Sequence, residues 1–467
     1  LYSSAASDVY KRQVMPVPDL SFHPSIFYGL DVLEQMDFKP LYGKTIGVFT
    51  NQTAVNRKGQ HILDLMKAHP KIDVKIIFTP QYGLFAEQND QFKLQGDQKY
   101  DPIYKARIVE VFGRNVKPPE WAMRGLDLIL IDIQDTGVRF STYIATMTKI
   151  LEVASEWSTP VMVLDRPNPL RGDRVDGPVV RPQFQSFEGY HIVPIRHGMT
   201  IGEMAIMANE MGWIKNLKRT NLTIIPMSNW KRSYWLDKSE HPWVSPQPQI
   251  KTIRTNLAYV GFGLIEGSNL NDGRGTDRPY LRIGAPWLSG FYLYEKLIQL
   301  KLPGVEFRVV EYVPRKKPDD KVIPLHVNKV CSGIDIYITN PDRFDPVGAA
   351  GLCVDQKHGY VYVTFAYLDK NGVHRNGIIR YENTPGRIGI EPNSSTYFLD
   401  LFKDEISDTS HQIGPCVIHN DELYIAVGFG RAKNESQNLD STLGSIIRMS
   451  LDFKPIKDNP FYRDDNK

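Results

Sequence analysis

Residues 126–139 read Leu-Asp-Leu-Ile-Leu-Ile-Asp-Ile-Gln-Asp-Thr-Gly-Val-Arg, an apolar run that passes directly into polar residues. A run of this kind predicts a central parallel strand that is buried on both faces. Asp132, Asp135 and Arg139 follow at the carboxyl end of that strand, which is the edge where open α/β sheets bind their ligands. Gly137 allows a sharp turn there. The stretch therefore predicts an α/β sheet and the position of its active cleft.

The sequence that follows repeats this unit. Residues 140–157 have the length and apolar spacing of a helix that covers the sheet, and residues 160–164 form a second buried strand. That strand stops at Asp165-Arg-Pro-Asn-Pro169, because the two prolines prevent its continuation. Two strands around one helix therefore deliver two acidic loops to the same edge.

Two earlier strands are predicted over residues 45–50 and 74–79, with helices over 29–36 and 59–69. The strands end in the polar runs Asn51-Gln-Thr and Pro80-Gln-Tyr-Gly. Alternating strands and helices are typical of a parallel sheet with right-handed crossovers. Turn chemistry alone explains any single polar loop, but four such loops at one edge favour a ligand site.

The composition of the chain excludes several classes of protein. Its 467 residues predict two or three domains, and a formal charge of +3 gives no reason to expect nucleic acid or an anionic membrane as a partner. The three cysteines lack metal-ligand spacing, and their odd number argues against a disulfide framework. No apolar run reaches the roughly 18 residues of a membrane span.

The first thirteen residues, Leu-Tyr-Ser-Ser-Ala-Ala-Ser-Asp-Val-Tyr-Lys-Arg-Gln, resemble a translated sequencing adapter. They show neither helical nor strand periodicity. We therefore interpret residues 1–13 as a non-native leader and exclude them from the fold. An export signal of the natural protein would then be missing from this chain.

A second type of sequence begins near residue 171. Residues 188–203 predict a strand, a loop and a helix, and Thr200 with Glu203 three residues later forms a capping box. Glu203 is therefore expected to stabilise the helix start and to take no part in chemistry. His197 precedes the helix and is either a hydrogen-bond donor to substrate or a structural residue.

Glycines are dense in residues 264–279, around Glu266, Asp272 and Arg274. Glycines expose the backbone to a ligand, and the charged residues among them are costly to bury unless they act on something. A nucleotide cradle is disfavoured because the glycine spacing does not fit a phosphate-binding loop. Aromatic residues in the neighbouring proline-rich loops either stack on sugar rings or form a core between domains, namely Trp230, Tyr234, Trp235, Trp243 and Trp287.

Taken in order, these motifs resemble the exo-β-N-acetylmuramidase family of glycoside hydrolases over residues 28–346. The motifs are Gly-Val-Phe-Thr-Asn-Gln-Thr at 47–53, Asp-Ile-Gln-Asp-Thr-Gly-Val-Arg at 132–139, Leu-Asp-Arg-Pro-Asn-Pro at 164–169, Pro-Ile-Arg-His-Gly-Met-Thr at 194–200, Glu-Gly-Ser-Asn at 266–269, Gly-Arg-Gly-Thr at 273–276 and Gly-Ala-Pro-Trp at 284–287. The resemblance implies a Rossmann-like domain over 28–180 and a cleft-completing, truncated α+β auxiliary region over 181–346. It also implies release of N-acetylmuramic acid from the non-reducing end of peptidoglycan fragments. Such a substrate implies a periplasmic or secreted protein.

Glycoside hydrolysis needs a carboxylic acid that protonates the leaving oxygen and a second carboxylate that acts as base or nucleophile. Glu266 is the first candidate for one role, and Asp135 or Asp132 for the other. The lactyl carboxylate of the sugar suits a planar guanidinium, for which Arg139 and Arg274 are the candidates. The remaining candidates for substrate binding are Asn51, Gln81, Tyr143, Asp165, Asn168 and His197. The hydrolase part is expected to need no cofactor and no metal.

The sequence departs from the family pattern at Gln81. Many members have Pro-Glu-His-Gly where this chain has Pro-Gln-Tyr-Gly at 80–83. If that glutamate is the proton donor, this chain lacks it, because a glutamine has no proton to give. Glu87 could replace it if its loop folds back. A catalytically impaired muropeptide-binding protein is therefore the rival hypothesis.

A third type of sequence begins at residue 347, where short runs with period-two alternation predict antiparallel blades over 347–467. The runs His-Gln-Ile-Gly at 411–414 and Leu-Gly-Ser-Ile-Ile-Arg at 443–448 resemble the quinoprotein glucose and sorbosone dehydrogenase propellers. That resemblance implies His411 as the base, with pyrroloquinoline quinone and calcium as cofactors of a complete propeller. A propeller typically needs about four to eight blades, which this tail is too short to supply. We therefore interpret the chain as an assembly chimera joined near Val347.

Overall fold

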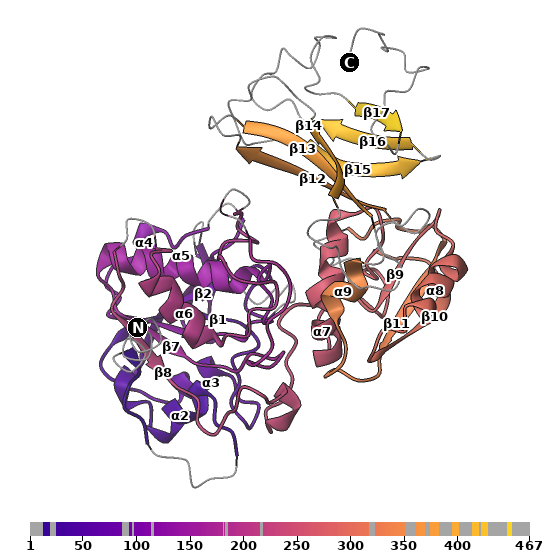
Figure 1. Ribbon diagram of the computed structural model, residues 1–467. Coiled ribbons are helices and arrows are strands. Elements are labelled where there is room, and N and C mark those ends of the chain that lie inside the picture. Colours follow the sequence, from indigo (N-terminus) through magenta and orange to yellow (C-terminus); the bar gives the residue numbers. More distant parts are fainter. Residues whose placement is uncertain are drawn as a thin grey trace, which may run out of the picture. The chain divides into compact units, whose positions relative to one another are not determined.

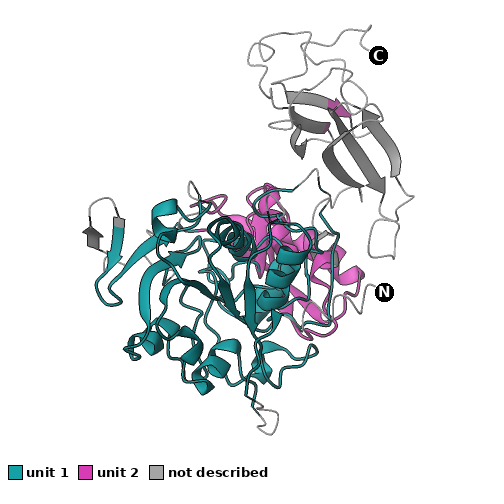
Figure 2. Ribbon diagram, turned by 90° about the vertical axis from the view of Figure 1, so that its left-hand side faces the viewer, with its two compact units in different colours: residues 1–260, 274–280, 315–323 teal, residues 261–273, 281–314, 324–467 magenta. Residues whose placement is uncertain are grey.

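The structure is a computed structural model. It describes residues 13–18, 25–85, 93–95, 98–113, 116–180, 182, 185–214, 218–316, 323–351, 360–368, 374–382, 395–400, 413–419, 422–427 and 446–450 (Figure 1). The chain forms two compact units, shown in different colours in Figure 2. Unit 1 comprises residues 1–260, 274–280 and 315–323, and unit 2 comprises residues 261–273, 281–314 and 324–467.

Unit 1 is built on an eight-stranded sheet with the strand order β3-β4-β5-β2-β1-β6-β7-β8. Six of these strands run parallel: β1 (Thr45–Thr50), β2 (Asp73–Thr79), β5 (Ala106–Glu110), β6 (Leu128–Asp132), β7 (Val161–Leu164) and β8 (Leu222–Ile225). The edge strands β3 (Lys93–Gln95) and β4 (Gln98–Asp101) pair antiparallel. Because β1 lies between β2 and β6, the topological switch point is at the carboxyl ends of β1 and β6.

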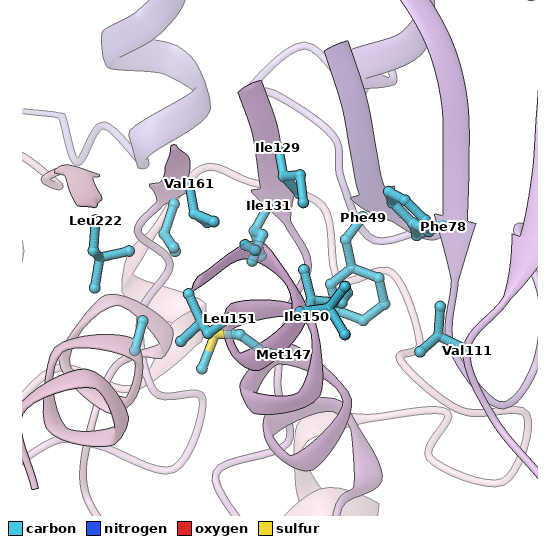
Figure 3. Packing of buried hydrophobic residues seen from close by; sticks show 14 of the residues in the cluster. Phe49, Phe78, Val111, Ile129, Ile131, Met147, Ile150, Leu151, Val161 and Leu222 are labelled. Atoms are coloured by element: carbon cyan, nitrogen blue, oxygen red, sulfur yellow. The ribbon is translucent and has the colours of Figure 1, made fainter. Parts of the chain in front are cut away.

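Helices cover both faces of this sheet. They are α2 (Gly29–Gln35), α3 (Ile62–Lys67), α4 (Glu120–Met123), α5 (Thr142–Trp157) and α6 (Ile201–Glu210). A further helix, α7 (Ile253–Phe262), follows later in the chain. Alternate side chains of β6 enter opposite cores: Ile129 and Ile131 pack with residues of α5 and α6, whereas Leu128 and Leu130 pack with residues of α2 and α3. The core of α5 and α6 is shown in Figure 3, where Met147, Ile150 and Leu151 approach Ile129, Ile131 and Phe49. The prediction that this strand is buried on both faces is confirmed.

The element predictions hold with small shifts of boundary. The strand predicted from residue 126 begins at Leu128, and the helix predicted from residue 140 begins at Thr142. The helix predicted over 59–69 is shortened to Ile62–Lys67, after His61, whose ring accepts a hydrogen bond from the Leu63 N–H. The capping box of α6 is present, since Thr200 accepts from the Glu203 N–H and Glu203 accepts from the Thr200 N–H.

The strand predicted within residues 188–196 is wrong. Arg196 makes isolated antiparallel bridges with Val138 and Asp176, and no continuous ladder forms among the described residues. Pro194 lacks an N–H, so the segment cannot donate at that position to a neighbouring strand. The segment nevertheless lies against the loop that follows β6, because the Arg139 N–H donates to the Ile195 carbonyl.

Unit 2 contains a three-stranded antiparallel sheet with the order β10-β11-β9. Its elements are the 3-10 helix η5 (Gly263–Gly267), β9 (Arg282–Ala285), α8 (Gly290–Gln299), β10 (Val305–Tyr312), β11 (Cys331–Ile338) and α9 (Pro346–Gly351). Arg282 and Asp335 form a two-pronged ion pair across β9 and β11, with contacts of 2.6 and 2.9 Å.

The tail forms two further antiparallel sheets of three strands each. One comprises β12 (Tyr360–Leu368), β13 (His374–Glu382) and β14 (Ser395–Asp400), and the other β15 (Ile413–His419), β16 (Glu422–Val427) and β17 (Ile446–Ser450). The predicted antiparallel blades are thus present in the described part of the tail.

The compact units divide the chain at a different place from the expected boundary at residue 180. Unit 1 continues to Val260, because β8 adds a strand to the sheet beside β7 and α6 packs on the same sheet. At the expected join near Val347, the chain is helical rather than extended, since α9 spans Pro346–Gly351. A Cβ built on Gly261 would lie 1.8 Å from the Pro346 carbonyl oxygen, so the end of α7 and the start of α9 pack closely within unit 2.

Candidate active site

Four parallel strands of unit 1 end at the same edge and place polar loops there. Asn51 follows β1, Gln81 follows β2, Asp135 follows β6, and Asp165 follows β7. Helix α5 begins at this edge with Thr142 and Tyr143. Thr142 Oγ1 donates to Gln81 Oε1 at 3.1 Å, which joins the loop after β2 to the helix after β6. The sheet therefore brings most of the predicted substrate-binding residues to one edge.

Asp135 is the carboxylate of this edge with spare hydrogen-bonding capacity. Its Oδ2 accepts the Gly137 N–H at 2.7 Å and lies 3.4 Å from His197 Nε2. Its Oδ1 is buried and has no hydrogen-bond partner. Gly137 has a φ of 78°, and a Cβ there would lie 2.4 Å from Asn168 Oδ1, so only glycine fits this turn.

His197 is held in one tautomer by its backbone neighbours. Its Nδ1 accepts the Met199 N–H at 3.2 Å, so the proton of the neutral ring is assigned to Nε2, which faces Asp135. The 3.4 Å separation is within the range of an ion pair, but Nε2 makes no well-aligned hydrogen bond. An imidazole N–H in this position can donate to a carboxylate or to a substrate oxygen.

Tyr143 lies at the centre of the edge and is completely buried. Burial raises the pKa of its hydroxyl well above the usual value, with Tyr82 and Asp135 among the groups that act on it. The hydroxyl donates to the Pro246 carbonyl oxygen. Asn51 also acts on the Tyr143 hydroxyl, and Asn51 Oδ1 accepts from Thr53 Oγ1 at 2.6 Å. Tyr143, Asn51 and Asp135 therefore lie together at this edge.

Asp132 is arranged differently. Both of its oxygens accept from Arg166, at 2.6 Å from Nε and 3.0 Å from the terminal nitrogen, and both side chains are buried. Arg166 also donates to the Val55 carbonyl at 3.2 Å. Burial lowers the pKa of Arg166, but Asp132 outweighs it, so the pKa of the guanidinium is above its ordinary value. This carboxylate ties β6, β7 and the loop after β1 together, which favours Asp135 over Asp132 for chemistry.

Asp165 and Asn168 are also engaged within the fold. Asp165 accepts from the Arg166 N–H, the Gly202 N–H and the Thr200 hydroxyl, and burial raises the pKa of its carboxyl to about 7. Asn168 donates to the Met199 carbonyl and accepts from the Leu170 N–H. Both side chains join β7 to the segment that carries His197, so they support the site from behind.

The two candidate arginines differ in their surroundings. Arg139 donates to the carbonyl oxygens of Pro178 and Val193 at 2.6 and 2.7 Å, and burial lowers the pKa of its guanidinium. These two bonds occupy one of its terminal nitrogens. Arg274 is half-buried in the 274–280 segment of unit 1.

The structure describes the other predicted catalytic residues only in part. Glu266 is exposed on η5 of unit 2. Glu87 and His411 lie outside the described residues. No group of three or more potential metal ligands occurs among the described residues. Within that same part of the chain, no helix is long and apolar enough to cross a bilayer.

Buried polar atoms without a hydrogen-bond partner are concentrated at the carboxyl edge. Such atoms are uncommon in folded proteins, and each requires an explanation such as a ligand or a catalytic role. Those that belong to the loops and helix starts of this edge, or that contact them, include Thr79 Oγ1, Asp135 Oδ1, Thr136 Oγ1, Ser141 Oγ, His197 Nε2 and Asn256 Oδ1. This concentration supports the carboxyl edge as the candidate active site.

Sequence reasoning missed several residues of this edge. Tyr82 acts on Tyr143, and Gln134 donates its backbone N–H to Thr53 Oγ1 at 2.9 Å. Both lie inside quoted motifs, so their position after a buried strand was the available signal. Asp31 and His241 form a buried pair at 2.7 Å, and nothing in the sequence connects positions so far apart.

Comparisons with known proteins give consistent results. The N-terminal model of the exo-beta-N-acetylmuramidase NamZ matches residues 46–254, and the C-terminal model of the same family matches residues 257–368. A glucose/sorbosone dehydrogenase model matches residues 348–467 and so overlaps the second model over 348–368. The shared part includes β12, which pairs with β13 of the tail.

Relatives and solved structures agree with these matches. The peptidoglycan beta-N-acetylmuramidase NamZ of Bacillus subtilis (strain 168) is 35% identical over 363 residues, which is 76% of this chain and 84% of the relative. A DUF1343 family protein of Bacteroides fragilis NCTC 9343 is 26% identical with a TM-score of 0.63, covering 70% of this chain and 81% of its own. A second such protein from the same strain is 27% identical with a TM-score of 0.53, covering 68% and 77%.

Proposed function

The chain belongs to the NamZ family of exo-β-N-acetylmuramidases, and from this membership we propose that it is a glycoside hydrolase that releases N-acetylmuramic acid from the non-reducing end of peptidoglycan fragments. The observation that carries the proposal is the buried, unpartnered Oδ1 of Asp135 at the carboxyl edge of the sheet. A buried carboxylate oxygen without a protein partner can bind a water molecule or a substrate, and a glycosidase needs such an oxygen.

In this proposal Asp135 acts as the base or nucleophile, and His197 is its partner. The Nε2–H of His197 faces Asp135 Oδ2, so it stabilises the carboxylate while Oδ1 faces the reaction. Asn51 and Tyr143 are buried beneath this edge, so in this proposal they hold its loops in place and do not contact the sugar. Glu266 is our choice for the acid that protonates the leaving oxygen, since it is an exposed carboxyl on a short helix in a family motif.

Arg274 is the proposed partner of the lactyl carboxylate, because it lies in the Gly-Arg-Gly-Thr motif at 273–276 that resembles the family. A guanidinium binds a carboxylate best through two parallel hydrogen bonds, which needs two adjacent nitrogens directed at the ligand. Arg139 already uses a terminal nitrogen to hold the Pro178 and Val193 carbonyls. Its role in this proposal is therefore to shape the loop after β6. Location outside the cytoplasm remains a prediction that follows from the proposed substrate.

The test is the release of the chromophore from a chromogenic β-N-acetylmuramoside. Asp135→Asn should lower kcat by about 100-fold or more, because removal of a positioned acid or base typically costs 10²–10⁴ in rate. The matched control is Asp73→Asn, which makes the same change at an exposed position at the amino end of β2, on the opposite edge of the sheet. Equal activity in both variants would remove Asp135 from the mechanism.

One observation favours a second candidate, a muropeptide-binding protein without turnover. By the resemblance, Gln81 stands where many family members have a glutamate. In the structure Gln81 Oε1 accepts a hydrogen bond from Thr142 Oγ1, and an amide has no proton to give to a leaving group. Gln81→Glu separates the two candidates. If the wild type is inactive and Gln81→Glu gains turnover, the chain is a binding protein that lost its acid. If the wild type is active, Gln81 is not needed as an acid.

The tail supports no step of the proposed reaction. The dehydrogenase model matches it, but the predicted base His411 lies outside the described residues. Pyrroloquinoline quinone and calcium therefore enter no part of the proposed mechanism.

A further inference from the structure

A short segment of unit 1, residues 239–246, crosses the carboxyl edge of the sheet and is called here the strap. Its residues His241, Pro242, Trp243 and Val244 line one small cavity together with Thr53 and Val55 after β1, Gln134 after β6, and Arg166 after β7. The strap therefore covers the topological switch point, where Rossmann-like sheets bind dinucleotides. About 10 Å³ remains between the strap and the sheet, which is room for one water molecule.

One end of the strap is fixed by His241. Its Nε2 lies 2.7 Å from Asp31 Oδ2, and the two side chains are 3% and 4% exposed. The imidazole also stacks on the Tyr28 ring, with centroids 3.5 Å apart and an interplanar angle of 6°. Asp31 is itself held by the backbone N–H groups of Tyr28 and Arg57. Burial raises the pKa of Asp31, but the hydrogen bond from His241 and the two backbone bonds lower it further, so its pKa is below the ordinary value.

The other end of the strap reaches the candidate active site. The Pro246 carbonyl accepts the hydroxyl of Tyr143, and the Ser245 carbonyl accepts Gln52 Nε2 at 2.8 Å. Asn51 and Asp135 both act on the pKa of the Tyr143 hydroxyl, Asn51 through a hydrogen bond and Asp135 through its charge. Gln52 directly follows Asn51. The positions of these groups therefore depend on where the strap presents its two carbonyl oxygens.

We propose that His241 is a positioning residue for the active site. Asp31 holds its imidazole, the imidazole holds the strap, and the strap carbonyls hold Tyr143 and Gln52 in the geometry that Asp135 needs. The inference rests on the proposed function for its catalytic part. In this proposal the strap occupies the crevice at the switch point. From there it positions the side chains of the glycosidase site.

The main experiment compares His241→Ala with His241→Gln in the full chain. The alanine variant releases the strap from Asp31, and kcat should fall by about tenfold to 100-fold, because a misplacement of about 1 Å near the reacting groups costs up to 10². KM should change less than threefold, since the sugar-binding groups remain. The glutamine amide can donate to Asp31 from the position of Nε2, so this variant should recover kcat to within about threefold of the wild type.

The matched control is His69→Ala. His69 is a half-buried histidine of unit 1 that contacts Phe38 and Tyr42 and is absent from both the strap and the site. Its kcat should equal that of the wild type at a temperature where all variants are folded. A His241→Ala variant with wild-type kcat, or a His241→Gln variant no better than the alanine variant, would overturn the positioning role.

Hydrogen exchange tests the strap without relying on catalysis. In His241→Ala, amides of residues 239–246 should exchange about tenfold to 100-fold faster than in the wild type, while the same amides in His69→Ala should not change. If the strap of His241→Ala exchanges at the wild-type rate, His241 does not hold the strap, whether or not the protein hydrolyses a muramoside. If His241→Ala exchanges faster than the wild type but the wild type hydrolyses no muramoside, the proposed function is wrong. The role of His241 in holding the strap would then still stand.

Discussion

Two buried carboxylate centres lie three residues apart at the end of β6, and they differ in how completely their hydrogen bonds are satisfied. Asp132 places both oxygens on Arg166, which is buried with it. Asp135 has one oxygen on the Gly137 N–H and beside His197, and its second oxygen is buried without a partner. Residue type and position in the motif do not distinguish the two.

This contrast indicates which carboxylate stabilises the fold and which is available for chemistry. A buried ion pair with complete hydrogen bonding is strongly destabilised when one partner is removed, because the other charge is left uncompensated. A buried oxygen without a partner contributes no such stability and marks a site where something else is to be bound. We therefore interpret the Asp132–Arg166 pair as a structural ion pair and call it the scaffold centre. The Asp135–His197 pair is the proposed catalytic group and is called the machinery centre.

The largest effect is expected when the scaffold centre is broken. Asp132→Asn leaves the buried Arg166 guanidinium without its hydrogen-bonded carboxylate and should lower the free energy of unfolding of unit 1 by about 3–5 kcal/mol. Thermal and denaturant unfolding, followed by tryptophan fluorescence, measure this change. Asp73→Asn, at an exposed position on the same sheet, should change it by no more than about 0.5 kcal/mol. Equal stability of the two variants would refute the scaffold interpretation.

A second scaffold carboxylate should show its burial through pH. Burial raises the pKa of the Asp165 carboxyl from its ordinary value of 3.8 to about 7. Because the pKa is raised on folding, the contribution of this group to stability is complete below about pH 4 and is lost as pH rises through about 7. The loss amounts to about 4 kcal/mol at most.

Asp165→Asn removes this titration and keeps the contacts, since its amide oxygen can accept from Gly202 and Arg166 and its NH₂ can donate to Thr200. The variant should therefore become more stable relative to the wild type as pH rises from 4 to 8. Unfolding curves at several pH values measure the difference. A constant difference across this range would show that Asp165 does not titrate there.

The smallest effect on stability is expected at the machinery centre. Asp135→Asn keeps an oxygen for the Gly137 N–H and replaces the unpartnered oxygen with NH₂, so the free energy of unfolding should change by about 0.5 kcal/mol or less. The same variant is expected to lose most of its activity. A loss of stability as large as that of Asp132→Asn would mean that the two centres do not differ in kind.

Much of the fold of unit 1 could be predicted because its signals are local. The apolar run at the end of β6, the prolines after β7 and the Thr200–Glu203 capping box each fix a structure within a few residues. The strand expected before Pro194 failed because its existence depended on a partner strand, and the segment forms isolated bridges at Arg196 instead. A strand is defined by what it pairs with, which a single segment does not show.

The candidate site could be predicted only in part for the same reason. The carboxyl edge, Asn51, Asp135 and Tyr143 follow from parallel-sheet topology, which brings the ends of successive strands together. The sequence does not predict that Asp132 is paired with Arg166 whereas Asp135 is not, because this depends on where the Arg166 side chain lies. His241 could not be found at all, since its partner Asp31 is 210 positions away in the chain.

Periodicity, turn residues and ordered motifs along the chain are enough to predict the parallel sheet, its ligand-binding edge, the family and the antiparallel tail. Tertiary structure alone decided which buried carboxylate is paired, which guanidinium is tied to backbone carbonyls, and that the strap fills the switch point. Each of these depends on hydrogen bonds between segments far apart in sequence. Burial makes every such bond consequential, since a polar atom removed from water must find its partner within the protein.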